Sequence, residues 1–432
     1  METIKLDAIP NKEKSKLPAV EVANHVDWVN AGFSSLPFNL QTGKPCAFGL
    51  FLTPSEEIRK WKDTSPAGAY LFGISTGEEV SQKIDTREIQ VRPGHYRSGM
   101  IGQVLFQDNE GRIYCDVDLK GIGEIGFSWN KENRINEDPN RPMVIPAGAR
   151  DFHDLKGDHV FGFRNKAHAL HDVQVAEKML DLGVRTHRII ALVSLQEIIS
   201  YGGEAPFFKR KNPKKTSIAE AKKKGLIPKD LEPVVEVRAF GTKTRVQEWG
   251  LNEANRPFFR KDILREIDDA RQLIIKEFKL EESDFDLGEY LKWLAEKMGR
   301  NLGIMHANGW RHGNAHGLNM TLDGRIIDFD GASKAEEEWN ADGSIQERWT
   351  KKNYVKGCFE YDIETATYDL QRLFSEVSRA IFEKEFGNSD KISNWEIDRK
   401  VFIRDRETDY RMSQGSISTY FKRGYDSVRT GS

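Results

Sequence analysis

The amino-acid sequence predicts a two-lobed α+β fold, in which a β-rich lobe precedes a helical one. Short apolar runs with β character fill residues 45–120, and long apolar stripes at helical spacing begin near residue 260. Further along, Asp323-Gly324 separates two short apolar runs, which is typical of a hairpin turn. With 432 residues the chain is long enough for two or three lobes that have cores of their own. We therefore expect two lobes with an active site between them.

The limits of the lobes follow from local composition. We expect residues 1–30 to form an irregular lead-in, residues 31–250 the first lobe, and residues 251–432 the helical lobe that carries the hairpin. A polar stretch near 128–165, rich in Asn, Asp, Arg and Pro, is predicted as an insertion in the first lobe. The basic stretch 209–224 is predicted as a solvated loop.

Composition excludes several classes of protein. The chain is 38% hydrophobic and 31% charged with a formal net charge of -2, which is typical of a soluble globular protein and argues against a nucleic-acid partner. No apolar run reaches the roughly 18 residues needed to span a bilayer. Cys46, Cys115 and Cys358 lie far apart, so neither a zinc site nor a disulfide framework is expected. We expect a cytoplasmic protein without a membrane partner.

The elements of the first lobe are short strands and one helix. The clearest strand covers residues 113–120, because its apolar residues alternate with polar ones and so share one face. Lys120 then falls on the polar face, at the end of the strand. Further β-like runs cover 47–52, 69–74, 102–106 and 188–193, and a helix is expected over 166–183.

The second lobe is expected to consist of amphipathic helices. One apolar stripe contains Ile263, Ile267, Ala270, Ile274 and Phe278, and another contains Leu287, Leu291, Leu294, Met298, Leu302 and Met305. Residues at this spacing lie on one face of a helix, so both stripes are predicted to form core.

Candidate metal ligands flank the hairpin turn. A two-residue turn at Asp323-Gly324 pairs residue 322 with 325 and, further out, Asn319 with Asp328. Their Cβ atoms would then be about 5 Å apart. An amide oxygen and a carboxylate at that separation suit a hard cation such as Mg²⁺, with Asp330 as a second metal contact. The spacing from His312-Gly313 to these residues is typical of a kinase-like phosphate-transfer site, and the alternative is an ordinary surface hairpin.

Several motifs in sequence order resemble a known family. Leu119-Lys120-Gly121-Ile122-Gly123 resembles L-K-G-A-G, residues 176–188 are similar to S-E-A-M-x-x-L-G-I-P-T-T-R, and residues 238–245 fall on R-V-A-P-S-H-x-R. Residues 312–328 keep the spacing of H-G-V-M-N-T-D-N and the following D-Y-G, and residues 368–373 are similar to W-N-L-Q-R-L. Over roughly residues 95–375 the chain thus resembles the selenoprotein O family, protein-kinase-like enzymes that transfer AMP to protein hydroxyls.

The resemblance implies that ATP and Mg²⁺ are cofactors and that a protein Ser, Thr or Tyr hydroxyl is the acceptor. Lys120 would bind the nucleotide phosphates, and Asp172 would orient that lysine by an ion pair, with Glu177 as the second choice. Arg238 and Arg245 would clamp the phosphates of a nucleotide bound in a flipped orientation, which presents its α-phosphate.

Further nucleotide contacts are implied by glycine and aspartate positions. Gly99 and Gly102 fall where the family has a glycine-containing loop, which would bring backbone N–H groups near phosphate; a plain hairpin turn is the alternative. Asp158, in Gly157-Asp158-His159, matches a second nucleotide contact of the family.

The chain departs from the family at the general base. The family's proton acceptor falls on Leu318, and the Asp of an H-G-D motif falls on Asn314, whose amide orients a hydroxyl but does not accept its proton. His316 is the one titratable side chain between Gly313 and Asn319, so it is the candidate base, with a structural role as its alternative. Two other functions therefore stay open: a kinase-like phosphotransferase acting on a small molecule or protein, and an inactive nucleotide-binding pseudokinase.

Overall fold

The computed structural model divides into two compact units. It describes residues 15–46, 50–52, 69–71, 74–75, 87–91, 98–122, 125–127, 163–201, 213–224, 227–247, 256–387 and 414–428. The first unit comprises Met1–Glu110, Tyr114–Val173 and Ile189–Ala239, and the second comprises Gly111–Ile113, Gln174–Arg188 and Phe240–Ser432. The second unit resumes at Phe240, eleven residues before the expected start at 251, and most of the expected insertion near 128–165 lies outside the described residues.

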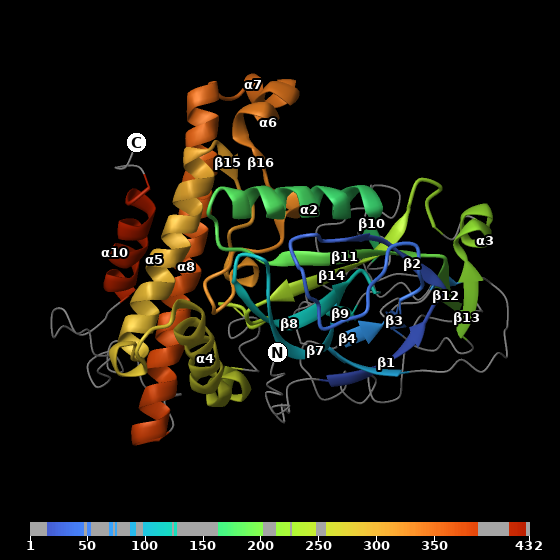
Figure 1. Ribbon diagram of the computed structural model, residues 1–432. Helices are drawn as coiled ribbons and strands as arrows, with labels where there is room; N and C mark the ends of the chain where they lie inside the picture. Colours follow the sequence, from blue (N-terminus) through green and yellow to red (C-terminus); the bar gives the residue numbers. More distant parts are fainter. Residues whose placement is uncertain are drawn as a thin grey trace. The chain divides into compact units, whose positions relative to one another are not determined.

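Among the described residues, the first unit is built on a nine-stranded sheet (Figure 1). The strand order is β2-β11-β14-β8-β7-β6-β1-β3, and β10 pairs with β14. These strands are β1 Ser15–Glu21, β2 Asn24–Val29, β3 Leu50–Leu52, β6 Arg87–Val91, β7 Ser98–Gln107, β8 Ile113–Lys120, β10 Arg164–Asn165, β11 Arg188–Leu195 and β14 Pro233–Phe240. Smaller pairings join β4 Ala69–Leu71 with β9 Ile125–Phe127, and β5 Ile74–Ser75 and β13 Pro213–Ser217 with β12 Glu197–Tyr201.

Helix α2 (Lys166–Asp181) begins in the first unit and covers part of this sheet. Its Ala169 and Val173 pack against Ile189 and Leu192 of β11 and against Val234 of β14. The helix matches the one expected over 166–183, because its apolar residues recur at helical spacing. The short helix α3 (Ile218–Lys223) begins at Ser217, whose side chain accepts the N–H of Glu220.

Several expectations for the first unit are wrong. The stretch 209–224, expected as a solvated loop, contains β13 and α3 in its described part. The segment predicted as an irregular lead-in contains β1 and β2, which join the sheet because β1 pairs with β3 and β6, and β2 pairs with β11. Strand β8 forms with the expected limits, but both of its faces are buried, so Lys120 is not on a solvated face. The polar residues of β8 are tolerated inside because charged partners of opposite sign lie beside them.

The second unit is largely helical. Its helices are α4 Arg256–Phe278, α5 Leu287–Ala307, α6 Ala335–Ala341, α7 Gly343–Gln346, α8 Lys351–Phe386 and α10 Gln414–Asp426, with short 3₁₀-helices η5 Glu282–Asp284, η6 Gly317–Asn319 and η7 Phe329–Gly331. A two-stranded pairing joins β15 Trp310–Arg311 to β16 Ser333–Lys334. Both predicted apolar stripes enter one core, except that Phe278 is exposed at the C-terminal end of α4.

Helices α5 and α10 approach each other closely at glycines (Figure 1). A Cβ added to Gly299 or Gly303 of α5 would collide with the carbonyl oxygens of Phe421 or Tyr425. A Cβ added to Gly424 of α10 would in turn collide with the backbone of Glu296. Glycine is thus required on both sides of this contact, because no side chain fits between the two backbones.

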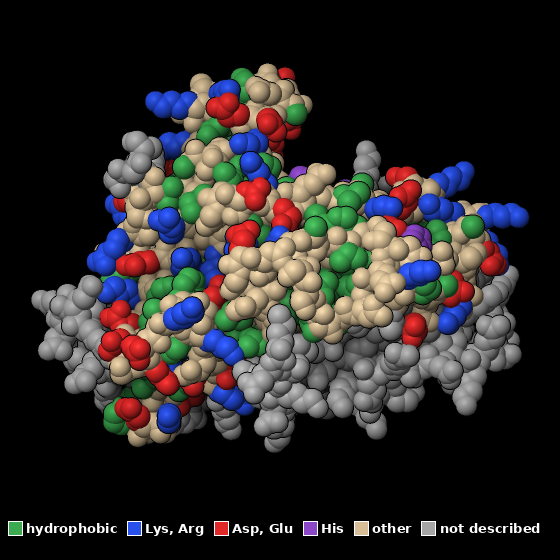
Figure 2. Space-filling view, in the orientation of Figure 1, with side chains coloured by type: hydrophobic (Ala, Val, Ile, Leu, Met, Phe, Trp, Pro, Cys, Tyr) green, Lys and Arg blue, Asp and Glu red, His purple; other side chains and the backbone are tan. Residues whose placement is uncertain are grey.

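The surface of the described residues carries mixed charge. Figure 2 shows Lys and Arg side chains interspersed with Asp and Glu side chains on the face that it presents. None of the helices in the described part of the chain combines the length and the apolar composition that a bilayer crossing requires.

Candidate functional site

The predicted hairpin forms, but its register differs by one residue from the expected one. Met320 pairs with Ile326, and the N–H of Ile327 donates to the carbonyl oxygen of Asn319 at 2.9 Å. Asn319 therefore lies opposite Ile327, so the expected pairing of Asn319 with Asp328 is wrong. The loop has three residues instead of two, and Gly324 occupies its left-handed position with φ 80°.

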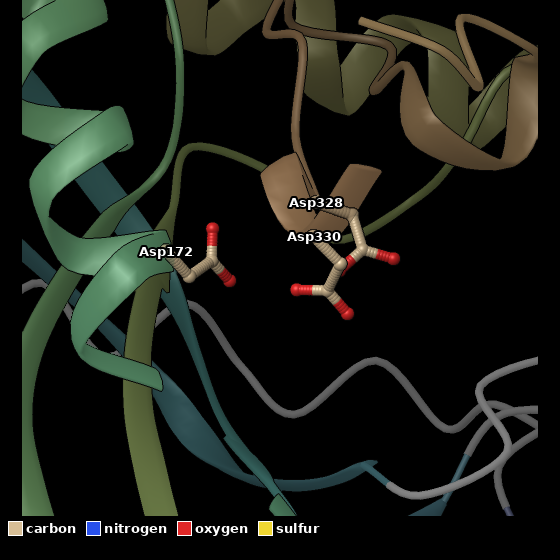
Figure 3. Close-up of side chains that lie close together, drawn as sticks. All are labelled: Asp172, Asp328 and Asp330. Carbon is tan, nitrogen blue, oxygen red and sulfur yellow. The ribbon is translucent and has the colours of Figure 1, made fainter. Parts of the chain in front are cut away.

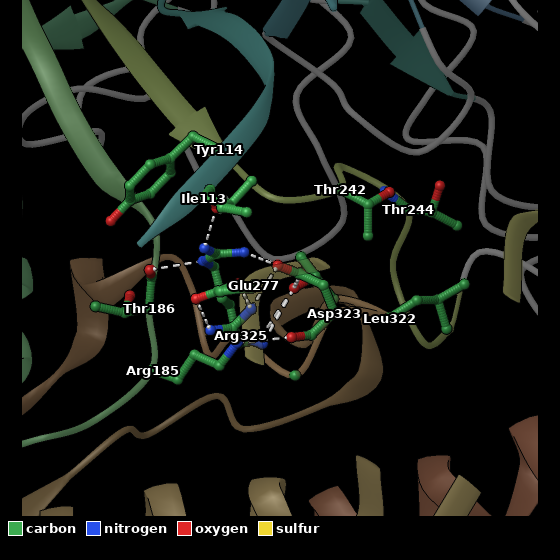
Figure 4. Close-up of polar contacts among 12 residues, drawn as sticks. Ile113, Tyr114, Arg185, Thr186, Thr242, Thr244, Glu277, Leu322, Asp323 and Arg325 are labelled. Atoms are coloured by element: carbon green, nitrogen blue, oxygen red, sulfur yellow. Dashed lines mark hydrogen bonds and ion pairs between the residues drawn. The ribbon is translucent and has the colours of Figure 1, made fainter. Parts of the chain in front are cut away.

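A buried polar network around the turn explains this register (Figure 4). The Thr321 hydroxyl donates to Asp323 at 2.6 Å, and the N–H of Gly324 donates to the Thr321 carbonyl at 3.0 Å. Arg325 forms an ion pair with Asp323 and donates to the carbonyl oxygen of Thr186 at 3.1 Å. The side chains of the turn thus bind one another. Because these contacts pair the buried charges of Asp323 and Arg325, they favour the three-residue loop.

Residues 244–246 extend the hairpin on its other side. Arg245 pairs with Thr321, the N–H of Val246 donates to Met320 O at 2.8 Å, and the N–H of Leu322 donates to Thr244 O at 2.9 Å. The backbone of Arg245 is therefore fixed beside the hairpin, in the second unit.

The loop 312–319, which precedes the hairpin, is held by its own first residue. The side chain of His312 is fully buried, and its Nε2 lies 3.0 Å from the carbonyl oxygen of Ile327. Burial lowers the pKa of His312 against the attraction of Asp362, so the ring is neutral near pH 7. A neutral ring that donates from Nε2 accepts at Nδ1, and the N–H of Asn314 lies 3.3 Å from that atom.

Two carboxylates of α8 hold the backbone of the same loop. Asp362 accepts the N–H groups of His312 and Gly313 at 2.7 and 3.0 Å, and Asp369 accepts the N–H of Gly317 at 2.7 Å. Burial alone would raise the pKa of Asp362, but the hydrogen bonds from the His306 side chain and from the backbone N–H of His312 lower it, so this carboxyl is ionised. No pattern in the sequence points to Asp362, whereas Asp369 belongs to the segment 368–373 that resembles W-N-L-Q-R-L.

The side chain of Asn319 is oriented by the loop. Its Nδ2 donates to the carbonyl oxygen of Asn314 at 3.0 Å, and the residue is buried. Because the amide nitrogen is committed to this bond, the amide oxygen points away from it and is the atom suited to ligate a cation. The five-residue spacing of the two asparagines matches the H-x-D-x4-N arrangement of protein kinases, with Asn314 in place of the aspartate.

Asp328 and Asp330 flank the start of η7 (Figure 3). Asp328 has left-handed backbone angles, φ 66° and ψ 71°, which cost an L-residue about 1–2 kcal/mol. A carboxylate oxygen of Asp328 lies within 4.8 Å of one of Asp330. Two carboxylates at this separation, with the amide oxygen of Asn319 in the same unit, are hard oxygen donors of the kind that Mg²⁺ requires. The donor set of the second unit therefore fits the predicted metal.

The two candidate catalytic residues differ in environment. Asn314 is exposed, whereas His316 is partly buried, and its Nδ1 has no hydrogen-bond partner among the described residues. Burial lowers the pKa of His316, against the attraction of Asp369. The imidazole is therefore neutral near pH 7 and chemically able to accept a proton.

In the first unit, Lys120 pairs with a carboxylate of the helix that follows it. The Nζ of Lys120 lies 3.9 Å from Oδ2 of Asp172, and both side chains are buried. Arg164 donates to the same carboxylate at 3.2 Å and also binds Glu236. Figure 3 shows Asp172 on α2. The pair resembles the strand-lysine and helix-carboxylate pair of protein kinases, with aspartate in place of glutamate. Glu177, the second choice, binds Arg188 instead.

One arginine of the predicted phosphate clamp, Arg238, is bound to a carboxylate. Arg238 binds Asp118 through Nε at 2.9 Å and Nη2 at 2.8 Å, and it also donates to Ser98 at 3.1 Å. This buried bidentate ion pair occupies the fork that was expected to bind phosphate. Arg238 belongs to the first unit and Arg245 to the second, so the two residues are parts of different compact units.

Three further residues were predicted to contact the nucleotide. Two of them lie in a strand, and the third lies outside the described residues. Gly99 and Gly102 lie in strand β7, so neither the expected glycine loop nor the plain hairpin turn is present there. The sheet takes up this segment, and the pairing of Gln90 with Met100 joins β7 to β6. Asp158 lies outside the described residues.

Comparisons with known proteins give only distant likenesses. No protein-family model matches the chain, and no curated protein matches it. One solved structure, a Toxoplasma gondii specific rhoptry antigen kinase domain, is 10% identical with a TM-score of 0.28, over 87% of this chain and 90% of that one. Another, ROP2 from Toxoplasma gondii, described as a virulence factor with a protein-kinase fold and no enzymatic activity, is 11% identical with a TM-score of 0.27, over 84% of each chain.

The fold class therefore rests on the chain's own architecture. A β-rich unit precedes a largely helical one, a strand lysine pairs with a helix carboxylate, and the motif of His312, Asn319 and Asp328 lies among the helices. The chain has an α+β fold with a β-rich and a largely helical unit, as the sequence predicts, and these features resemble those that protein kinases combine.

Proposed function

We propose that this chain binds ATP as its Mg²⁺ complex at a kinase-like site. The observation that carries the proposal is the conformation of Asp328, a non-glycine residue with φ 66° directly before Phe329 and Asp330. Backbone strain of this kind concentrates at functional sites, where the surrounding structure enforces it. A carboxylate held in this way, with a second one within 4.8 Å, supports a role as a metal ligand.

Each group in the proposal has a defined task. The amide oxygen of Asn319 and the carboxylates of Asp328 and Asp330 would hold Mg²⁺, which supplies positive charge to phosphate oxygens when bound. Lys120, oriented by Asp172, would contribute a further positive charge to phosphate.

Calorimetry of ATP binding with and without Mg²⁺ tests this proposal. We expect tight ATP binding only with Mg²⁺. Asp328→Asn preserves the shape of the side chain but removes its charge, so Mg²⁺ should no longer increase the affinity of this variant for ATP. Glu347→Gln, which neutralises an exposed carboxylate of the second unit, is the matched control and should bind like the unmodified protein. Equal ATP affinity with and without divalent ions in the unmodified protein would contradict the metal assignment.

A second candidate function is group transfer from ATP to a hydroxyl, and His316 favours it. Its neutral imidazole, with Nδ1 unpartnered among the described residues, is suited to accept the hydroxyl proton that neither Asn314 nor Leu318 accepts. The resemblance to the selenoprotein O family favours AMP as the transferred group, with pyrophosphate as the leaving group. The ion pair of Arg238 with Asp118 weighs against a two-arginine clamp and leaves γ-phosphoryl transfer as the alternative.

Labelled ATP distinguishes these functions. The protein is incubated with Mg²⁺ and ATP labelled at the α- or the γ-phosphate, alone and with candidate hydroxyl acceptors. Label from the α-phosphate on protein, with release of pyrophosphate, supports AMP transfer; label from the γ-phosphate supports a kinase. Metal-dependent ATP binding without transfer of either label supports a nucleotide-binding pseudokinase.

A further inference from the structure

A line of buried polar contacts connects α10 to the loop 312–319 within the second unit. The hydroxyl of Tyr425 lies 2.9 Å from Nδ1 of His306, and Nε2 of His306 lies 3.3 Å from Oδ2 of Asp362. The carboxylate of Asp362 accepts the backbone N–H groups of His312 and Gly313. All three side chains, which we call the Tyr425–His306–Asp362 relay, are buried. The last helix described is thus joined to the loop that carries Asn319.

The positions of the protons in the relay follow from its acceptor. An ionised carboxylate accepts hydrogen bonds and donates none, so Nε2 of His306 must carry the proton that Asp362 receives. When the ring carries this one proton, Nδ1 is the acceptor, and the hydroxyl of Tyr425 donates to it. Without this donor, the ring is free to place its proton on Nδ1, and a lone pair at Nε2 would then face the carboxylate.

The parts of the relay are held in place by packing. The ring of His306 stacks on Phe359 of α8 with centroids 4.2 Å apart and planes at 10°. Gly303 and Gly424 bring the backbones of α5 and α10 together, which fixes Tyr425 against His306. The imidazole therefore has little freedom to rotate, so its tautomer decides whether it donates to Asp362.

We propose that Tyr425 is a positioning residue for the loop 312–319, because its hydroxyl fixes the tautomer of His306 and through it the orientation of the Asp362 carboxylate. Its link to nucleotide rests on the proposed function, in which Asn319 of this loop binds Mg²⁺. Tyr425 itself touches neither metal nor substrate in this proposal.

The change Tyr425→Phe tests the relay, because it removes one hydroxyl and keeps the ring that packs between α5 and α10. We expect amide hydrogen exchange at His312 and Gly313 to speed up about tenfold, because the hydrogen bonds of these amides to Asp362 become weaker. We also expect the ring-nitrogen NMR shifts of His306 to report proton transfer from Nε2 to Nδ1. Tyr420→Phe, the same change at a buried tyrosine of the same helix, is the matched control and should alter neither.

A second variant separates the tautomer from general packing. In His306→Gln, the side-chain amide donates to Asp362 without any tautomer to fix. Adding Tyr425→Phe to this variant should therefore leave exchange at His312 and Gly313 unchanged. Equal effects of Tyr425→Phe with and without His306→Gln would overturn the proposal, as would unchanged exchange and unchanged His306 shifts in Tyr425→Phe alone.

The same variants separate the relay from the proposed function. If the unmodified protein binds Mg²⁺ and ATP, Tyr425→Phe should weaken that binding several-fold, and unchanged affinity would overturn the positioning role. If the unmodified protein binds no ATP, the proposed function fails, and the exchange and NMR measurements still decide whether Tyr425 sets the tautomer of His306.

Discussion

At the scale of single residues, Asp328 combines backbone strain with a proposed metal-binding role, so its two properties can be separated by substitution. Asp328→Gly should be more stable than Asp328→Ala by about 1–2 kcal/mol, because glycine adopts the left-handed region without the Cβ clash that alanine suffers. Both changes should remove the dependence of ATP binding on Mg²⁺. Urea unfolding measures the first effect and calorimetry the second; equal stabilities would show that the left-handed conformation is not maintained.

His316 is expected to determine the acid limb of any transfer activity. Burial lowers its pKa, so the ring is neutral at pH 7 and becomes protonated only at a pH below the ordinary histidine value. Activity should therefore persist down to the ordinary histidine pKa and decline only at lower pH, where the base becomes protonated. The rate of label transfer against pH measures this limb. In His316→Ala the residual rate should be low and flat, and a preserved limb would assign the titration to another group.

Arg238 is expected to act in stability rather than in phosphate binding. Arg238→Ala leaves Asp118 charged and buried without its bidentate partner, so the free energy of unfolding should fall by about 3–5 kcal/mol. The double change Asp118→Leu with Arg238→Met removes both charges and should recover most of that loss. Denaturant unfolding provides the measurement. A small loss in Arg238→Ala together with a large loss of ATP affinity would instead favour the phosphate clamp.

At the scale of elements, the contact between α5 and α10 depends on the absence of side chains. Gly299→Ala would force a Cβ into the backbone of Phe421, so α10 should detach and become accessible to protease. Gly357→Ala is the matched control in α8, since no atom lies within 4 Å of its added Cβ; it should stabilise the helix by roughly 0.5–1 kcal/mol. Limited proteolysis of the C-terminal segment and thermal unfolding compare the two. Intact α10 in Gly299→Ala would contradict the close approach.

The sequence predicts elements well where the signal is local. Apolar and polar residues alternate over 113–120, and apolar residues recur at helical spacing over 263–274. The structure contains the strand and the helix that these patterns predict. The register of the hairpin was not predictable from Asp323-Gly324 alone, because it depends on buried bonds of Thr321 and Arg325. Arg325 donates to backbone carbonyl groups of segments that are distant in sequence, and the local sequence does not show which segments surround the turn.

Contacts between site residues were predicted only where motifs of a known family indicated them. The pairing of Lys120 with Asp172 agrees with the expectation that motif resemblance provided, although the two lie on a strand and a helix far apart in sequence. The partners of Arg238 and of the loop were not foreseen, since 120 residues separate Arg238 from Asp118 and 50 separate His312 from Asp362. A buried aspartate on a long helix has no sequence pattern that identifies its backbone partners.

At the scale of the whole molecule, binding of ATP should raise the stability of the chain through mass action. Free ligand at a hundredfold excess over its Kd stabilises a folded protein by about 2.7 kcal/mol. We therefore expect Mg²⁺ with ATP to raise the Tm by several degrees, and a chelator to abolish the shift. ATP alone and Mg²⁺ alone are the controls. An equal shift with ATP in the presence of chelator would mean that the nucleotide binds without the metal.

Helix α8 gives the loop 312–319 a further property. Its 36 residues form a single rod, and Asp362 and Asp369, two turns apart, fasten three amides of the loop to one side of that rod. The conformational entropy of this loop is consequently lost when the protein folds, and little remains to be lost when a ligand arrives. A ligand that meets Asn319 would find it already in position, so the kinetics of association should follow a single phase limited by encounter, without a slower closing step.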